Sequence, residues 1–237
     1  MACIRAGLGA MAVIGLLLAA SPSAHARPPD AGQGRPSGTT HPRSPDAARA
    51  PADFGGVQAS LDARDLAAWI AAVHDHRGRP FAIVDKKAAR LYVFTPQAKL
   101  AGASPVLLGL AVGDRAAPGL GDVPPGRIPA AQRTTPAGRF LTEPGTNLEG
   151  ERVVWFDYEA GLAIHRLRPN AAELARTRRL ATTDPRAHRV SAGCVVVPVE
   201  FYESVVIRWL GHARGLLYVL PEVERVNEVF AGLDDDL

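Results

Sequence analysis

Residues 81–94 read FAIVDKKAARLYVF, two apolar runs on either side of a short polar stretch. The runs 81–84 and 91–94 are rich in β-branched and aromatic residues, and residues 85–90 lie between them. Runs of this length and composition, bounded by polar residues, are typical of β-strands. The sequence therefore predicts a β-hairpin over residues 81–94.

Further short strands and a few helices are predicted on both sides of this hairpin. Apolar residues recur at helical spacing over 61–77, and Gly78 can end that helix. Beyond the hairpin, we expect strands at 106–112, 140–142, 153–156, 162–165 and 216–220, and helices at 171–180, 201–210 and 223–230. Residues 113–129 are rich in Gly and Pro and predict a long surface loop. Many short strands with few helices indicate a β-rich α+β domain.

The first 26 residues have the composition of a secretory signal peptide. Arg5 supplies a positive charge, residues 10–20 are apolar apart from glycine, and Ala24 and Ala26 place small residues at a cleavage site. The apolar run is short for a membrane span, and the alternative is an uncleaved N-terminal anchor. In both cases we expect an exported chain in the periplasm or cell envelope, which contacts the membrane only through this segment.

Composition predicts one folded domain behind a linker. Residues 27–56 are rich in Pro, Gly and Ser, lack periodic apolar residues, and are expected to be disordered. We assign 57–78 to an N-terminal helix, 79–220 to the main domain, and 221–237 to a C-terminal helix and acidic tail. The apolar fraction of 47% is typical of a globular core. The formal charge of +3, or +2 without Arg5, is too weak to indicate a nucleic-acid partner.

Removal of the leader, which contains Cys3, leaves Cys194 as a single cysteine. It cannot form an internal disulfide, so the thiol is either a small buried apolar group or a reactive one. Its surroundings at 189–198 read RVSAGCVVVP. A cysteine nucleophile needs access, a base and donors for an oxyanion. Gly193 permits a tight turn before Cys194, which can direct backbone amides into a cleft.

The base must come from another part of the chain. His165 ends the apolar run 162–165, and a strand there would hold its ring rigidly. His188, six positions before Cys194, is the alternative base. Zinc held by these two histidines and Cys194 is a further alternative, but three scattered ligands without a local spacing motif support it weakly. We therefore expect no metal and no cofactor.

The order of these segments resembles a known family. LAIH at 162–165, followed after a connection by SAGC at 191–194, resembles the catalytic motif of the YkuD-type L,D-transpeptidases. Residues 81–94 resemble that family's opening hairpin, residues 106–113 its next strand, and TPAGRF at 135–140 its Thr-Pro-x-Gly-x-Phe segment. The resemblance covers 79–220. It implies an L,D-transpeptidase-like β-sandwich or barrel with a few flanking helices.

The resemblance also implies a function in peptidoglycan biosynthesis, cell wall organisation and cell shape. Cys194 would be the nucleophile and His165 the base, with the Arg166 carbonyl orienting the ring and Gly193 shaping the loop. Peptidoglycan stem peptides would be the substrate. A thioester on Cys194 would be resolved by an acceptor amine from a second stem to form a cross-link.

Several expected substrate contacts depart from the family pattern. We expect Ser191, Ala192 and Val196 to lie beside the substrate. Many family members have histidine at the position of Ala192, and many have Arg or Asn at the position of Val196. The connection from His165 to Ser191 is longer than usual and is rich in arginine: Arg166, Arg168, Arg176, Arg178, Arg179, Arg186 and Arg189. We expect Arg178 and Arg179 to bind stem-peptide carboxylates from a basic flap. The alternative is a solvated helix face.

Two other kinds of function remain open. If water resolves the thioester, the same site is an L,D-carboxypeptidase, and another thiol hydrolase such as an amidase would use the same groups. The departures at Ala192 and Val196 instead suggest a catalytically inactive cell-wall-binding domain.

Overall fold

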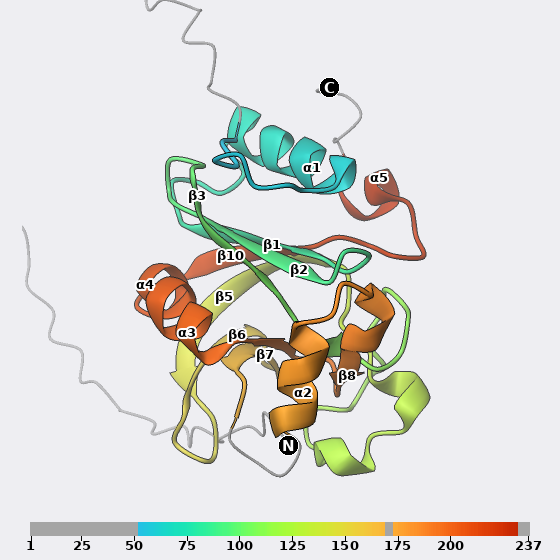
Figure 1. Cartoon of the computed structure of the whole chain (residues 1–237). Coiled ribbons are helices and arrows are strands. Elements are labelled where there is room, and N and C mark those ends of the chain that lie inside the picture. Colours follow the sequence, from blue (N-terminus) through green and yellow to red (C-terminus); the bar gives the residue numbers. More distant parts are fainter. Residues whose placement is uncertain (1–51, 169–172, 232–237) are drawn as a thin grey trace, which may run out of the picture. The chain divides into compact units, whose positions relative to one another are not determined.

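The computed structural model describes residues 52–168 and 173–231 (Figure 1). The predicted signal peptide, nearly all of the predicted linker and the last six residues lie outside the described residues. Within the described part, no helix has both the length and the apolar character needed to cross a membrane.

An eight-stranded sheet, in the order β3-β2-β1-β10-β5-β6-β7-β9, organises the fold. Its strands are β1 (Phe81–Asp85), β2 (Arg90–Phe94), β3 (Leu100–Pro105), β5 (Gly138–Thr146), β6 (Arg152–Asp157), β7 (Leu162–Arg166), β9 (Val195–Val197) and β10 (Gly215–Val219). The β1–β10 and β7–β9 pairs are parallel, and the other pairs are antiparallel. A small second sheet pairs β4 (Leu108–Gly109) with β8 (Arg189–Ser191). The predicted hairpin over 81–94 is formed by β1 and β2.

The long strand β5 joins the two halves of the large sheet. Its residues 138–142 pair with β10, and its residues 143–146 pair with β6. Leu107, just beyond β3, exchanges two backbone hydrogen bonds with Val196 of β9, with N–O distances of 2.8 and 2.9 Å. This bridge joins the chain beyond one edge strand to the other edge strand, so the sheet is nearly closed. The expected β-rich α+β architecture with a few helices is confirmed.

Both faces of the β1–β2–β10 region are covered, as Figure 1 shows. Helix α1 (Leu61–Ala72) packs on one face, and α3 (Val199–Phe201), the π-helical segment η4 (Tyr202–Val206) and α4 (Ile207–Leu210) pack on the other. Successive side chains of a strand point to opposite faces, so Phe81 and Ile83 pack toward α1 whereas Ala82 and Val84 pack toward η4 and α4. This two-sided cover explains why residues 81–84 of β1 are all apolar and buried.

Helix α1 is tied to the sheet at its first turn. The Ser60 hydroxyl accepts a hydrogen bond from the Ala63 amide as an N-cap and donates one to the Asp85 carboxylate at 2.6 Å. The remaining helices are α2 (Glu173–Leu180), α5 (Val226–Val229), and the 3-10 turns η1 (Pro125–Arg127), η2 (Ala130–Gln132) and η3 (Pro185–His188).

Three predicted elements need correction. The strand predicted at 106–112 is wrong, because this segment forms only the two-residue β4 and single-residue bridges at Leu107 and Ala111, while the third strand of the sheet is β3. Helix α1 ends at Ala72 rather than at residue 77. The helix predicted at 223–230 shortens to the single turn of α5.

Candidate active site

Cys194 follows a tight loop between β8 and β9. Gly193 has a φ of +127°, and a Cβ atom there would lie 2.7 Å from the Thr134 carbonyl oxygen and 2.8 Å from Leu162 Cδ2. Only glycine adopts this conformation and fits this space at low cost. The Ser191 hydroxyl donates to the Cys194 carbonyl at 2.7 Å and accepts from the Gly193 amide at 3.1 Å. The Gly193 amide is therefore engaged within the loop and is not an oxyanion donor.

His165 lies on β7, the strand next to β9. The two strands are parallel, and His165 is the register partner of Val196. The imidazole Nδ1 lies 2.8 Å from the Arg166 carbonyl oxygen. A carbonyl oxygen only accepts hydrogen bonds, so in the neutral ring Nδ1 carries the proton and Nε2 keeps its lone pair. This is the tautomer that a general base needs when the proton is taken at Nε2.

Cys194 and His165 both line one cavity of about 120 Å³. The lining residues come from segments 116–134, 160–165 and 190–196, together with Leu107 and with Arg176 of α2. Cys194 is 7% exposed and His165 is 6% exposed. The thiol also packs in the large apolar core, and its sulfur lies 3.8 Å from the Gly161 carbonyl oxygen. The thiol therefore sits at the boundary between the core and the cavity.

The expected substrate-binding residues divide into two groups. Ser191, Ala192 and Val196 line the cavity. Arg178 and Arg179 are exposed and do not line it, and Arg179 donates to the Ala187 carbonyl at 2.8 Å. Arg176 lines the cavity instead.

Val196 has an apolar environment that accounts for its side chain. It is 3% exposed and packs in a small cluster with Leu107, Leu167 and Leu180. Leu180 is the last residue of α2, so this cluster attaches the arginine-rich connection to the floor of the cavity. A long charged side chain at position 196 would have to displace that contact.

The alternative base and the zinc alternative find little support in the geometry. His188 is buried, and its two ring nitrogens face the carbonyl oxygens of Val106 and Thr182 at 2.9 and 3.1 Å. It does not line the cavity. Within the described ranges, no three His, Cys, Asp or Glu residues cluster as metal ligands.

Two residues at this site were not selected from the sequence. Arg176 was one of seven arginines in the connection, and only its position on α2 separates it from the others. Thr135 is fully buried, and its hydroxyl donates to the Gly193 carbonyl at 2.8 Å. The Thr-Pro-x-Gly-x-Phe pattern marked its segment, but the pattern does not show what the hydroxyl contacts.

Comparison with known proteins gives matches at the level of structure only. No protein-family model matches the chain, and no curated protein matches it. The solved structures that match include L,D-transpeptidases, the family that the motifs resemble, and a cell-shape protein.

The cell-shape protein is the helical cell shape determining protein Pgp2 from Campylobacter jejuni, with 14% identity over 62% of this chain and 48% of that one, at a TM-score of 0.41. The L,D-transpeptidase from Xylanimonas cellulosilytica gives 15% identity over 60% of each chain and a TM-score of 0.37. The catalytic domain of the E. faecium L,D-transpeptidase gives 17% identity over 61% of this chain and 99% of that one, at 0.30. The chain thus spans about half to three fifths of the length of the first two.

Proposed function

We propose that this protein is a cysteine-dependent acyltransferase, an L,D-transpeptidase that cross-links peptidoglycan stem peptides. The observation that carries the proposal is the cavity lined by both Cys194 and His165, with the imidazole Nδ1 anchored on the Arg166 carbonyl. The LAIH and SAGC motifs support the substrate class through their resemblance to the family. Export to the cell envelope, with residues 1–26 as signal peptide and 27–56 as linker, belongs to the same proposal.

The chemistry follows from these two side chains. His165 Nε2 takes the thiol proton, and the Cys194 thiolate attacks the carbonyl carbon at the L-centre of the diamino acid in a donor stem. The C–S bond forms, the C–N bond to the terminal D-residue breaks, and the leaving amine takes the proton from the imidazolium. An acceptor amine then attacks the thioester while His165 Nε2 takes its proton. The new amide forms, the C–S bond breaks, and the thiolate leaves and regains a proton from the imidazolium. This sequence needs no cofactor.

Arg176 is the arginine that we assign to substrate carboxylates, in place of Arg178 and Arg179. It lines the same cavity as the thiol. A stem peptide bound there would present its carboxylates to this guanidinium. A guanidinium can form two parallel hydrogen bonds with a carboxylate, and such charge-assisted bonds are stronger than neutral ones. Of the three arginines on α2, Arg176 lines the cavity, while Arg178 and Arg179 face solvent.

Burial of the thiol favours a second candidate, a wall-binding domain without catalysis. A cysteine that is 7% exposed and packed in the apolar core also fits a structural role. Ala192 and Val196 also support this second candidate, because they are apolar side chains at positions where many family members have polar ones.

The deciding experiment is incubation of the purified protein with tetrapeptide muropeptides, with products read by mass spectrometry. A transpeptidase yields a cross-linked dimer and the released D-amino acid, and a carboxypeptidase yields the shortened stem without dimer. Cys194→Ser should give neither product. Release of the stem from the glycan would indicate an amidase, and unchanged muropeptides would support the non-catalytic domain.

A further inference from the structure

A buried charge network lies behind the Cys194 loop. Lys86, in the turn between β1 and β2, has a fully buried side chain. Its ammonium donates to the Gly113 carbonyl at 2.6 Å, to Asp114 Oδ1 at 2.6 Å and to the Thr135 carbonyl at 3.0 Å. These three bonds use every donor that an ammonium has. Lys86 thus fixes the position of the Thr135 backbone.

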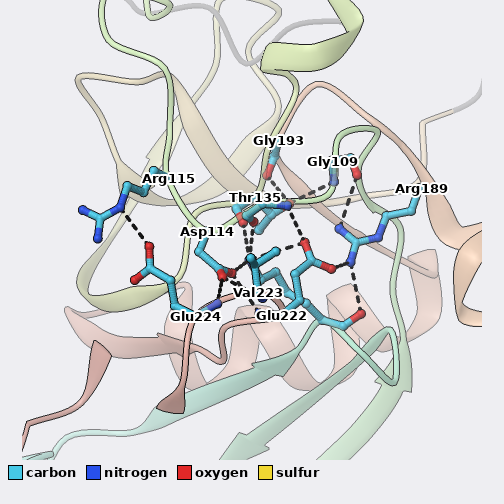
Figure 2. Close-up of polar contacts among 11 residues, drawn as sticks. Gly109, Asp114, Arg115, Thr135, Arg189, Gly193, Glu222, Val223 and Glu224 are labelled. Carbon is cyan, nitrogen blue, oxygen red and sulfur yellow. Dashed lines mark hydrogen bonds and ion pairs between the residues drawn. The ribbon is translucent and has the colours of Figure 1, made fainter. Parts of the chain in front are cut away.

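The network is closed by a segment that follows β10. The Asp114 carboxylate accepts hydrogen bonds from the backbone amides of Glu222, Val223 and Glu224 at 2.9, 2.8 and 2.7 Å (Figure 2). The Glu222 carboxylate lies 3.6 Å from the Lys86 ammonium and also pairs with Arg189. Two cations therefore face two carboxylates, which is the arrangement that buried charges require.

Thr135 connects this network to the candidate nucleophile. Its hydroxyl accepts from the Gly109 amide at 2.9 Å and donates to the Gly193 carbonyl at 2.8 Å, and Figure 2 shows it beside both residues. The backbone at Gly109 lies close to the backbone of residues 133–135, because a Cβ atom at Gly109 would lie 2.3 Å from the Arg133 carbonyl oxygen. The hydroxyl uses its one proton and accepts one hydrogen bond, so it has a fixed orientation.

We propose that Thr135 is a positioning residue for Cys194, a role that rests on Cys194 being the nucleophile as proposed above. The Gly193 carbonyl and the Cys194 amide belong to one planar trans peptide unit, so fixing the oxygen fixes the direction of the N–H. Thr135 therefore sets the orientation of the nucleophile's own amide and the entry of the chain into β9. The Lys86–Asp114 network holds Thr135 in place.

The test compares variants that differ in one hydroxyl. Thr135→Val removes both side-chain hydrogen bonds at nearly constant volume, whereas Thr135→Ser keeps the hydroxyl. The control is Thr142→Val on β5, because the buried Thr142 hydroxyl accepts a hydrogen bond from the Gly215 amide at 3.0 Å, a bond of the same kind. The readouts are the alkylation rate of Cys194 by iodoacetamide against pH, kcat and KM on tetrapeptide stems, and the urea unfolding midpoint of the full chain.

We expect Thr135→Val to lower kcat roughly 10- to 100-fold with little change in KM, since small displacements of reacting groups have effects of this size. Its alkylation–pH profile should shift, and Thr135→Ser should restore the profile and most of kcat. Thr142→Val should lose stability without either change. If Thr135→Val does not fold, Thr135→Ala replaces it, because alanine removes the hydroxyl without adding an apolar atom.

Three results would overturn the role. Thr135→Val with lower stability but wild-type kcat and alkylation profile would leave Thr135 as a purely structural residue. A Thr135→Ser protein as impaired as Thr135→Val would show that the hydroxyl is not the group responsible. If Cys194 of the native wild-type protein is not alkylated and the protein does not convert tetrapeptide stems, both the proposed function and this role are overturned. The first two results, in contrast, overturn only the role of Thr135.

Discussion

At the scale of single residues, the ionisation of Cys194 separates an enzyme from a structural thiol. A model cysteine titrates near pH 8.5, and a neighbouring imidazolium lowers that value. We expect the thiol of the native protein to react quickly with a small alkylating agent at pH 7. His165→Ala should slow this reaction roughly tenfold at pH 7 and much less at pH 10, where the thiol ionises unaided. The measurement is the labelling rate at a series of pH values.

The opposite pattern is equally specific. A structural thiol would label only when the protein unfolds, would show no dependence on His165, and would lose stability in Cys194→Ala. His188→Ala is not a useful control for the base, because its two backbone contacts make a loss of stability the expected result.

Arg176 has a matched control on its own helix. Arg176→Gln should raise KM for a tetrapeptide stem roughly tenfold, since a charge-assisted hydrogen bond is typically worth 1.5–3 kcal/mol. Arg178→Gln, at an exposed position, should leave KM unchanged. Wild-type protein should also favour a stem with free carboxylates over its amidated form, and Arg176→Gln should lose that preference. Equal kinetics for the two variants would show that Arg176 does not bind substrate, and would support the alternative that the arginines of α2 form a solvated helix face.

From the sequence, Cys194 and His165 could be proposed as site residues, and both line the cavity, but the arginine that lines it could not be selected. Cys194 and His165 each lie in a short motif next to an apolar run, so their chain neighbours alone mark them as candidates. The choice among Arg176, Arg178 and Arg179 depends on the rotation of α2. Leu180 is buried, and the residue four positions earlier lies on the same face of a helix, which directs Arg176 inward. That rotation is known only once the partner of Leu180 is known.

At the scale of elements, the strand error at 106–112 has a similar cause. Val106, Leu107 and Leu108 are fully buried, but Leu110 and Val112 are exposed and no long ladder forms. The true neighbour of β2 is β3, whose sequence LAGASP has a weak strand signal. Its small residues leave room for packing: a Cβ atom at Gly102 would lie 3.0 Å from Phe201.

The docking of α2 yields a prediction at this scale. Leu180 anchors the helix in the cluster with Val196, whereas Leu174 on the same helix is 64% exposed. Leu180→Ala should raise hydrogen exchange at α2 amides by roughly tenfold or more, because truncating a buried leucine costs about 2 kcal/mol or more. Leu174→Ala should leave exchange unchanged. Equal exchange in the two variants would mean that the cluster does not hold α2.

At the scale of the whole molecule, the Lys86–Asp114 network predicts a loss of stability in acid. Burial alone would raise the pKa of Asp114, but hydrogen bonds from Lys86 and three backbone amides lower it from 3.8 to about 2. A carboxylate whose pKa is lower in the folded state than in the unfolded state stabilises the fold at any pH above its unfolded-state pKa. This contribution is lost as the pH falls through the folded-state pKa. We expect about 2 kcal/mol to be lost between pH 4 and pH 2, measured by urea unfolding at several pH values.

Two substitutions test this prediction, one in the buried network and one in the surface ion pair of Lys87, the residue next to Lys86. Asp114→Asn should destabilise the protein by about 3 kcal/mol at pH 7, because it leaves the buried Lys86 charge without its main partner, and should reduce the acid dependence. Lys87 pairs with Asp62 at the surface, where their side chains are 54% and 40% exposed. Asp62→Asn should therefore change stability by less than about 1 kcal/mol. Similar losses in both variants would contradict the network's role.

The parallel pairing of β1 with β10 has a consequence for the order in which the protein assembles. A ribosome makes β1 early and β10 late, so this interior pair of the large sheet cannot form until the whole intervening chain has been synthesised. Contacts between residues so far apart in sequence also slow folding, because the loop between them must be closed first. Lys86, made with the first hairpin, meets Glu222 only after β10 is in place. We expect a nascent chain released before residue 222 to remain sensitive to protease, and its Cys194 to be labelled without any dependence on His165.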